Sequence, residues 1–376
     1  MSRDKCIDFA PHRRVLKLNA FYTDILSQPA ALQRLLSEYN PGSERTLSSI
    51  PCPNAPILTG MGSSYHAMLA ASICLQSHGV RAQAMETTTL LYYGGPILEG
   101  CREVIYLSQS GASAEVIPFI DRLECGRVFL AITNDLESPL ARRAEHVLSL
   151  GVLEESLVAS KTYLNSLALL WLLVHLWTGM TDGTELERLE HVAAYLKTAL
   201  GHEKATTSAW LDFFKDTHTI ICTGHGPHVA TALQAAQTLA EWAKTPALGI
   251  SAGALRHGFV EVVAPGVGVI VFSGSGPTQA VSLRLAQELA SYGARALLVE
   301  DGRSFAVRLQ RDGSSAVDAA RDLTLEPMPG EEFQVTDEFL ALLVDILPLQ
   351  LFSVALAHQR GIPPGFRYLE KVVHDL

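Results

Sequence analysis

The sequence is poor in cysteine and has no pattern of metal ligands. Six cysteines occur in 376 residues, none of them in a CxxC pair, and no HExxH motif is present. Disulfide frameworks and zinc sites both need paired spacings of this kind, so neither is expected to organise the fold. We therefore expect reduced thiols, mostly in the core, with no metal and no cofactor, in a reducing compartment such as the cytoplasm.

Basic charge and long apolar runs are also scarce. The formal net charge is −10 and no basic stripe occurs, so nucleic acid is not expected as a partner. The most hydrophobic run, residues 164–177, includes Asn165, Ser166 and His175. It is too short and too polar to span a bilayer, so we predict a buried core helix there. No apolar signal segment follows the first five residues, and no membrane partner is expected.

What the sequence does contain is apolar residues, at 48% against 18% charged. That composition is typical of a globular protein with a large core, and the length suffices for two or three domains.

Residues 104–115 join a short apolar run to a cluster of hydroxyl and amide side chains. The run 104–107 predicts a buried parallel strand, and a helical pattern begins at Val116. Polar residues at the carboxyl end of such a strand lie where α/β sheets bind ligands, beside the next helix N-terminus. The candidates for an anion-binding site there are Ser108, Gln109, Ser110 and Ser113. The alternative is that these hydroxyls only cap the helix.

The strand, turn and helix pattern of the first half returns in the second half. Residues 57–62 match 221–226, and residues 107–111 match 272–276, at offsets of 164 and 165 residues. Two motif pairs at nearly one offset predict an internal duplication. The fold class we expect is α/β, with two tandem doubly wound parallel-sheet domains of the flavodoxin-like kind. The expected bounds are 1–50 for an N-terminal helical segment, 51–200 and 201–360 for the two domains, and 361–376 for a C-terminal tail.

The two copies differ in their polar residues. His228 stands where the first copy has Ser64, and Gly274 stands where it has Gln109. We therefore expect the first copy to bind the anion. We expect the second copy to have a structural role and to contribute residues to the site from other parts of the chain.

Three ionisable residues have unusual neighbours. Glu241 is the one acid on the predicted helix 229–243, His257 lies in the glycine-punctuated loop 249–258, and Lys371 lies in the tail. Each could simply face solvent. A buried Glu would instead have a raised pKa suited to proton transfer.

In combination these motifs resemble the SIS (sugar isomerase) family, in particular the isomerase half of glutamine–fructose-6-phosphate amidotransferase and its deaminase relatives. The resemblance runs from Phe21 to Lys371. The motifs that carry it are residues 60–65, 108–111, 158–162, 253–258 and 367–371.

The resemblance implies a role for each candidate residue. Glu241 would move a proton between C1 and C2 of an open-chain sugar. His257 would open the sugar ring in the site of a neighbouring subunit, and Lys371 would form a Schiff base with the ketose. The implied phosphate contacts are Ser63, Ser64, Ser108, Gln109, Ser110 and Ser113, with Gly62, Val158 and Ala159 as further substrate contacts.

The sequence also departs from the family pattern. Thr238 replaces a lysine three residues before Glu241, residues 160–162 invert the order S-T-K, and Phe259 replaces a proline. Met1 and Ser2 lead directly into the opening helix, so we expect no glutaminase domain.

From the retained residues we predict a homodimeric isomerase/deaminase that converts glucosamine 6-phosphate, or a related 2-amino-hexose 6-phosphate, to fructose 6-phosphate and ammonia. The alternatives are a deglycase of phosphorylated fructosamines and a non-catalytic sugar-phosphate-binding regulator. Residues 1–50 lack the basic helix-turn-helix that such a regulator usually carries.

Overall fold

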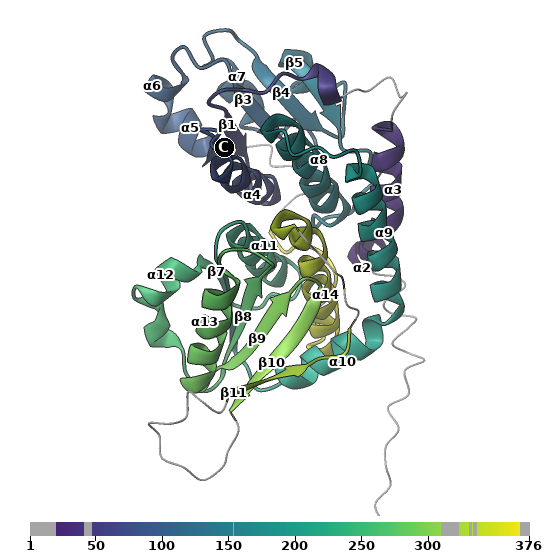
Figure 1. The fold of residues 1–376 in the computed structure, drawn as a ribbon, viewed down its shortest axis with the longest axis vertical. Coiled ribbons are helices and arrows are strands. Elements are labelled where there is room, and N and C mark those ends of the chain that lie inside the picture. Colours follow the sequence, from purple (N-terminus) through teal and green to yellow (C-terminus); the bar gives the residue numbers. More distant parts are fainter. Residues whose placement is uncertain are drawn as a thin grey trace, which may run out of the picture.

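The computed structural model describes residues 20–40, 47–152, 154–309, 323–330, 333 and 337–368. Two α/β units lie one above the other in Figure 1, and helices pack between and beside them. Lys371 lies outside the described residues, so its predicted role is not tested by the geometry.

The first unit contains a five-stranded parallel sheet with the order β2-β1-β3-β4-β5. Its strands are β1 (Ile57–Gly60), β2 (Gln83–Glu86), β3 (Val104–Leu107), β4 (Val128–Thr133) and β5 (Ala144–Ser149). This is the flavodoxin-like order, and its switch point between β1 and β3 is the usual position of a ligand. The predicted doubly wound sheet is confirmed, and the central strands β3 and β4 are wholly buried.

Helices follow the strands of this unit as the sequence predicts. They are α4 (Ser63–Ser77) after β1, α5 (Thr87–Tyr93) and α6 (Gly95–Leu98) after β2, and α7 (Val116–Ile120) after β3.

The second unit repeats the first over four strands. They are β6 (Thr219–Gly224), β7 (Ala247–Ser251), β8 (Val267–Ser273) and β9 (Arg295–Glu300), with α11 (His228–Glu241), α12 (Ala252–Arg256) and α13 (Gln279–Ser291) between them. Their order β7-β6-β8-β9 matches β2-β1-β3-β4, and all four are parallel. The duplication seen in the sequence is therefore present in the fold.

The second sheet also carries two antiparallel strands at one edge, which the sequence analysis did not anticipate. Strands β10 (Arg303–Leu309) and β11 (Leu323–Pro327) are antiparallel to their neighbours. Only Asp301 and Gly302 join β9 to β10, with φ of 51° and 78°. An Asp-Gly pair with two positive φ angles closes a tight hairpin, which forces the chain to return antiparallel.

The two units are joined through helices that pack between them. The equivalent helices α4 and α11 contact each other across the interface, where His66 Nδ1 lies 3.0 Å from Gln234 Oε1. The remaining helices are α2 (Ala20–Leu26), α3 (Gln28–Glu38), α8 (Lys161–Thr178), α9 (Glu185–Gly201), α10 (Glu203–Phe213) and α14 (Glu338–Gln359). In Figure 1, α9 runs along the side of the molecule past both units.

The predicted apolar run 164–177 is the buried body of α8, as expected. The sequence analysis missed α14, which is more apolar. Within the described residues α14 alone is long and apolar enough to cross a bilayer, and its apolar window is entirely buried in the protein. Buried in this way, α14 packs against α8, α10 and α11 as a core helix.

Candidate active site

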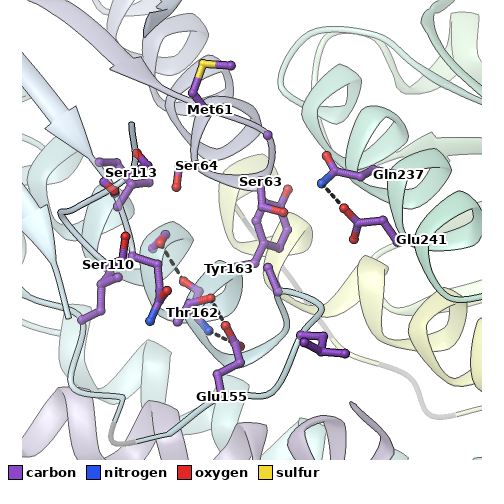
Figure 2. Close-up of a pocket in the computed structure, with 18 of the residues that line it drawn as sticks. Met61, Ser63, Ser64, Ser110, Ser113, Glu155, Thr162, Tyr163, Gln237 and Glu241 are labelled. Carbon is purple, nitrogen blue, oxygen red and sulfur yellow. Dashed lines mark hydrogen bonds between the residues drawn. The ribbon is translucent and has the colours of Figure 1, made fainter. Parts of the chain in front are cut away.

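A cavity of about 360 Å³ opens between the two units. On one side are the turns after β1 and β3, and on the other is the end of α11 (Figure 2). The sequence-predicted residues that line it are Gly62, Ser63, Ser64, Ser108, Gln109, Ser110, Ser113, Ala159 and Glu241. Most of the predicted site is thus brought together in a single cavity.

We call Ser63, Ser64, Ser108, Gln109, Ser110 and Ser113 the hydroxyl cradle. The helices beside it are not capped by these side chains, because Gly62 and Glu115 occupy the N-cap positions of α4 and α7. Only Ser108 and Ser110 accept bonds from nearby backbone, at 3.1 Å from Gly111 N and 3.2 Å from Ala112 N. The simple capping alternative therefore accounts for little of the cradle. None of the described residues lining the cavity is Lys or Arg.

Glu241 faces the cradle from the opposite wall (Figure 2). Gln237 Nε2 donates to Glu241 Oε1 at 2.8 Å, which holds the carboxylate in one orientation. Burial raises the pKa of Glu241, against the opposing effects of the Gln237 bond and the Lys244 charge. A carboxylate with a raised pKa suits general acid–base chemistry near neutral pH. The sequence analysis missed Gln237, although residues four apart share one helix face.

A second carboxylate, Glu155, also lines the cavity, but it is already hydrogen-bonded to residues at the start of α8. It accepts bonds from Ser160 N and Thr162 N, each at 2.9 Å, and from the hydroxyl of Thr162. It therefore caps the start of α8 and leaves proton transfer to Glu241.

The inverted order of residues 160–162 has a structural explanation. Lys161 Nζ pairs with Asp24 Oδ1 at 2.8 Å, so this lysine is anchored to α2. Thr162 faces the cavity in its place. Thr238 is fully buried and donates to Gln234 O at 2.9 Å, and it does not line the cavity.

Two predicted residues do not join the cavity within this chain. Val158 is fully buried in the large hydrophobic core, while its neighbours Leu157 and Ala159 line the cavity. His257 lies just after α12 with an exposed side chain, next to exposed Phe259. A single chain therefore leaves the predicted ring-opening histidine away from Glu241.

The turn after β8 in the second unit is filled by the protein itself. A Cβ on Gly276 would lie 2.3 Å from Glu338 Oε2, and one on Gly274 would lie 2.7 Å from His228 Nε2. Ser275 also donates to Asp301 Oδ2 at 2.6 Å. Among the described residues, carboxylates of α14 and the β9–β10 turn occupy the space at this turn that the first unit leaves open.

His228, the first residue of α11, lies beside this filled turn and is expected to make folding sensitive to acid. It is fully buried, neither ring nitrogen has a hydrogen-bond partner, and burial lowers its pKa from 6.5 to about 3. A depressed folded pKa gives stability that is present above pH 6.5 and is lost as the pH falls toward 3. We expect His228→Gln to flatten the fall in unfolding free energy between pH 7 and 5, measured by urea titration. The exposed control His191→Gln should keep the wild-type slope, and equal slopes in all three proteins would contradict this assignment.

A family model, the SIS domain, matches residues 50–176 and 213–306, more than half of the chain. The chain belongs to the SIS domain family. The resemblance read from the sequence is thereby confirmed, and the two matched segments correspond to the two α/β units of this SIS protein.

Named relatives of this SIS protein include glutamine–fructose-6-phosphate aminotransferases (isomerizing). That of Methanothermobacter thermautotrophicus is 28% identical over 357 residues, covering 91% of this chain and 55% of the relative. That of Thermococcus kodakarensis is 27% identical over 351 residues, with the same coverage. The chain spans about half the length of these curated relatives.

Solved structures share the fold at lower identity. The C-terminal domain of glucosamine-fructose-6-phosphate aminotransferase from Francisella tularensis has a TM-score of 0.73 at 19% identity, covering 96% of this chain and 98% of that one. A glucosamine-6-phosphate deaminase from Thermotoga maritima has 0.70 at 20%, covering 94% and 99%. A tagatose-6-phosphate ketose/aldose isomerase from Escherichia coli has 0.70 at 18%, covering 93% and 96%.

Proposed function

We propose that this SIS protein is a phosphosugar isomerase that deaminates a 2-amino-2-deoxyhexose 6-phosphate, with glucosamine 6-phosphate giving fructose 6-phosphate and ammonia. One observation carries the proposal. A cavity of hexose-phosphate size has a neutral cradle of hydroxyls at one end and a carboxylate with a raised pKa at the other.

The cradle suits a phosphoryl group. Neutral hydroxyls and the N-terminus of the 15-residue helix α4 supply hydrogen bonds and positive potential without a basic side chain. Anchoring the phosphate fixes the remote end of the sugar, so that C1 and C2 are oriented toward Glu241.

Glu241 would then carry the proton. It removes the proton from C2 of the open-chain aminosugar and returns it to C1, which converts the aldose amine to the 2-imine of the ketose. Water adds to C2 of this imine, and ammonia leaves, so that one water is consumed for each ammonia released. The deaminase named among the structural relatives supports this direction of reaction for the fold.

The test is direct. Purified protein is incubated with glucosamine 6-phosphate and other 2-amino-hexose 6-phosphates, and ammonia and ketose phosphate are measured together. We expect equal amounts of the two products. A protein that binds these sugars but turns over none of them would be a regulator, and that result would overturn the proposal.

We further infer a homodimer in which His257 of the partner subunit completes each site, because His257 is exposed away from the cavity of its own chain. The Glu241→Gln and His257→Asn proteins should each be inactive alone. Activity should return when the two are mixed and allowed to exchange subunits. Half of the dimers would be mixed, each with one intact site, so about a quarter of the wild-type activity is expected. Recovery of no activity from dimers shown to have exchanged would contradict the shared site.

A further inference from the structure

Gln237 lies on the cavity wall one helical turn before Glu241, and both side chains point into the cavity (Figure 2). Its amide also reaches the first unit. A Cβ added to Gly62 would lie 3.4 Å from Gln237 Nε2 and 3.7 Å from Gln237 Oε1. Gly62 directly precedes Ser63 and Ser64 of the hydroxyl cradle. The Gln237 amide therefore lies between the loop that carries the cradle and the Glu241 carboxylate.

Glu241 fixes the orientation of this amide. The nitrogen of Gln237 faces Glu241 Oε1 at 2.8 Å, because an amide oxygen in that place would oppose a second acceptor. This bond uses one of the two N–H groups and leaves the other N–H and the oxygen Oε1. Within the part of the chain that the structure describes, neither of these has a hydrogen-bond partner. Gln237 is half-buried and lines the cavity, so a ligand in the cavity can bond to both.

The order of groups along an open-chain sugar indicates which part of the ligand meets this amide. In the proposed function the C6 phosphate lies in the hydroxyl cradle, and C1 and C2 lie beside Glu241. The next carbon from C2 toward the phosphate is C3. Gln237 is the neighbour of Glu241 on the side of the cradle, so its amide lies next to the C3 substituent. A hydroxyl there can both accept from the free N–H and donate to Oε1.

We propose that Gln237 is a specificity-determining residue that binds the C3 hydroxyl of the substrate. The substrate class then narrows to 2-amino-hexose 6-phosphates with a free hydroxyl at C3. This inference rests on the proposed function, because it places the phosphate in the cradle and the reacting carbons at Glu241. A sugar without this hydroxyl fills the cavity but leaves the amide of Gln237 unpaired, which costs binding in the ground state and the transition state.

The experiment compares glucosamine 6-phosphate with its 3-deoxy and 4-deoxy analogues, in the wild type and in Gln237→Leu. We expect the wild type to prefer the parent sugar over the 3-deoxy analogue by about tenfold in kcat/KM, the effect of one hydrogen bond. Gln237→Leu should reduce this preference to about twofold or less. The preference over the 4-deoxy analogue should be the same in both proteins. A ratio of two substrates in one protein cancels any general loss from a less well oriented Glu241.

Gln279→Leu is the matched control. Gln279 Nε2 donates to Glu300 Oε1 at 2.9 Å, so this pair has the same chemistry as Gln237 and Glu241, but Gln279 is exposed on α13 and does not line the cavity. Its variant should keep the wild-type preference for the 3-hydroxyl. Gln237→Met, with a side chain closer in length to glutamine, replaces Gln237→Leu if the leucine variant does not fold.

The outcomes separate the contact from the proposed function. If glucosamine 6-phosphate is turned over but the 3-deoxy preference is absent, or is unchanged in Gln237→Leu, the contact is overturned and the proposed function stands. A preference that changes at C4 instead of C3 also overturns it. If none of the sugars is turned over, the proposed function fails. The same ratios, measured as affinities by calorimetry in the wild type and the variants, then decide the contact.

Discussion

Replacing Glu241 by glutamine is expected to lower kcat for glucosamine 6-phosphate by about 10²- to 10⁴-fold, the usual contribution of one general acid–base group. The amide keeps the size of the carboxylate and can still face Gln237, so the affinity for the sugar phosphate should change only a few-fold. Calorimetric titration beside steady-state kinetics separates the two quantities.

The same substitution should raise the unfolding free energy at pH 7 to 8. Burial raises the pKa of Glu241 in the folded state, so its favourable contribution is present at low pH and is lost as the pH rises through the folded pKa. Glutamine removes that loss because it carries no charge. The exposed control Glu190→Gln on α9 should change neither activity nor stability. A kcat for Glu241→Gln within twofold of wild type would exclude Glu241 as the proton carrier.

Replacing Gly111 by alanine should disrupt the loop that carries Ser108 and Ser110. Gly111 has φ of 59°, and an added Cβ would lie 2.2 Å from Ser138 Oγ and 2.9 Å from Thr133 Oγ1. Backbone strain of about 1–2 kcal/mol adds to an overpacking cost of about 1–3 kcal/mol. We expect a loss of about 3 kcal/mol in unfolding free energy, together with weaker binding of sugar phosphate.

Gly100→Ala is the matched control for this substitution. Gly100 has φ of 72° and no atom within 4 Å of an added Cβ, so it reports the backbone strain alone. We expect it to cost about 1 kcal/mol and to leave phosphate binding unchanged, measured by urea unfolding and calorimetry. Equal losses in the two variants would show that the contacts of Gly111 with Ser138 and Thr133 do not matter.

The parts of the fold that could be predicted were those with local signals. The run 104–107 and the glycine-rich turns marked the central strands, and the repeated motifs revealed the duplication, because copies of one unit keep their turn chemistry. The hydroxyl cradle followed from the same logic, since polar residues after neighbouring parallel strands meet at one edge of a sheet.

The parts that could not be predicted depend on tertiary contacts or on signals that were passed over. The Asp301–Gly302 pair is a hairpin signal that sequence reasoning could have used, and it turns the last strands antiparallel. The contacts of Lys244 gave no such signal, because they join it to Gly365 and Phe366, which lie far away in the chain. The cytoplasmic location and the homodimer stay predictions.

The measurement that tests the account most directly is a crystal structure of the Glu241→Gln protein with glucosamine 6-phosphate bound. We predict the phosphate within hydrogen-bonding distance of Ser110 and Ser113, and C1 and C2 of the sugar beside residue 241. A phosphate bound anywhere else, or a sugar whose C1 and C2 lie beyond the reach of residue 241, would contradict it.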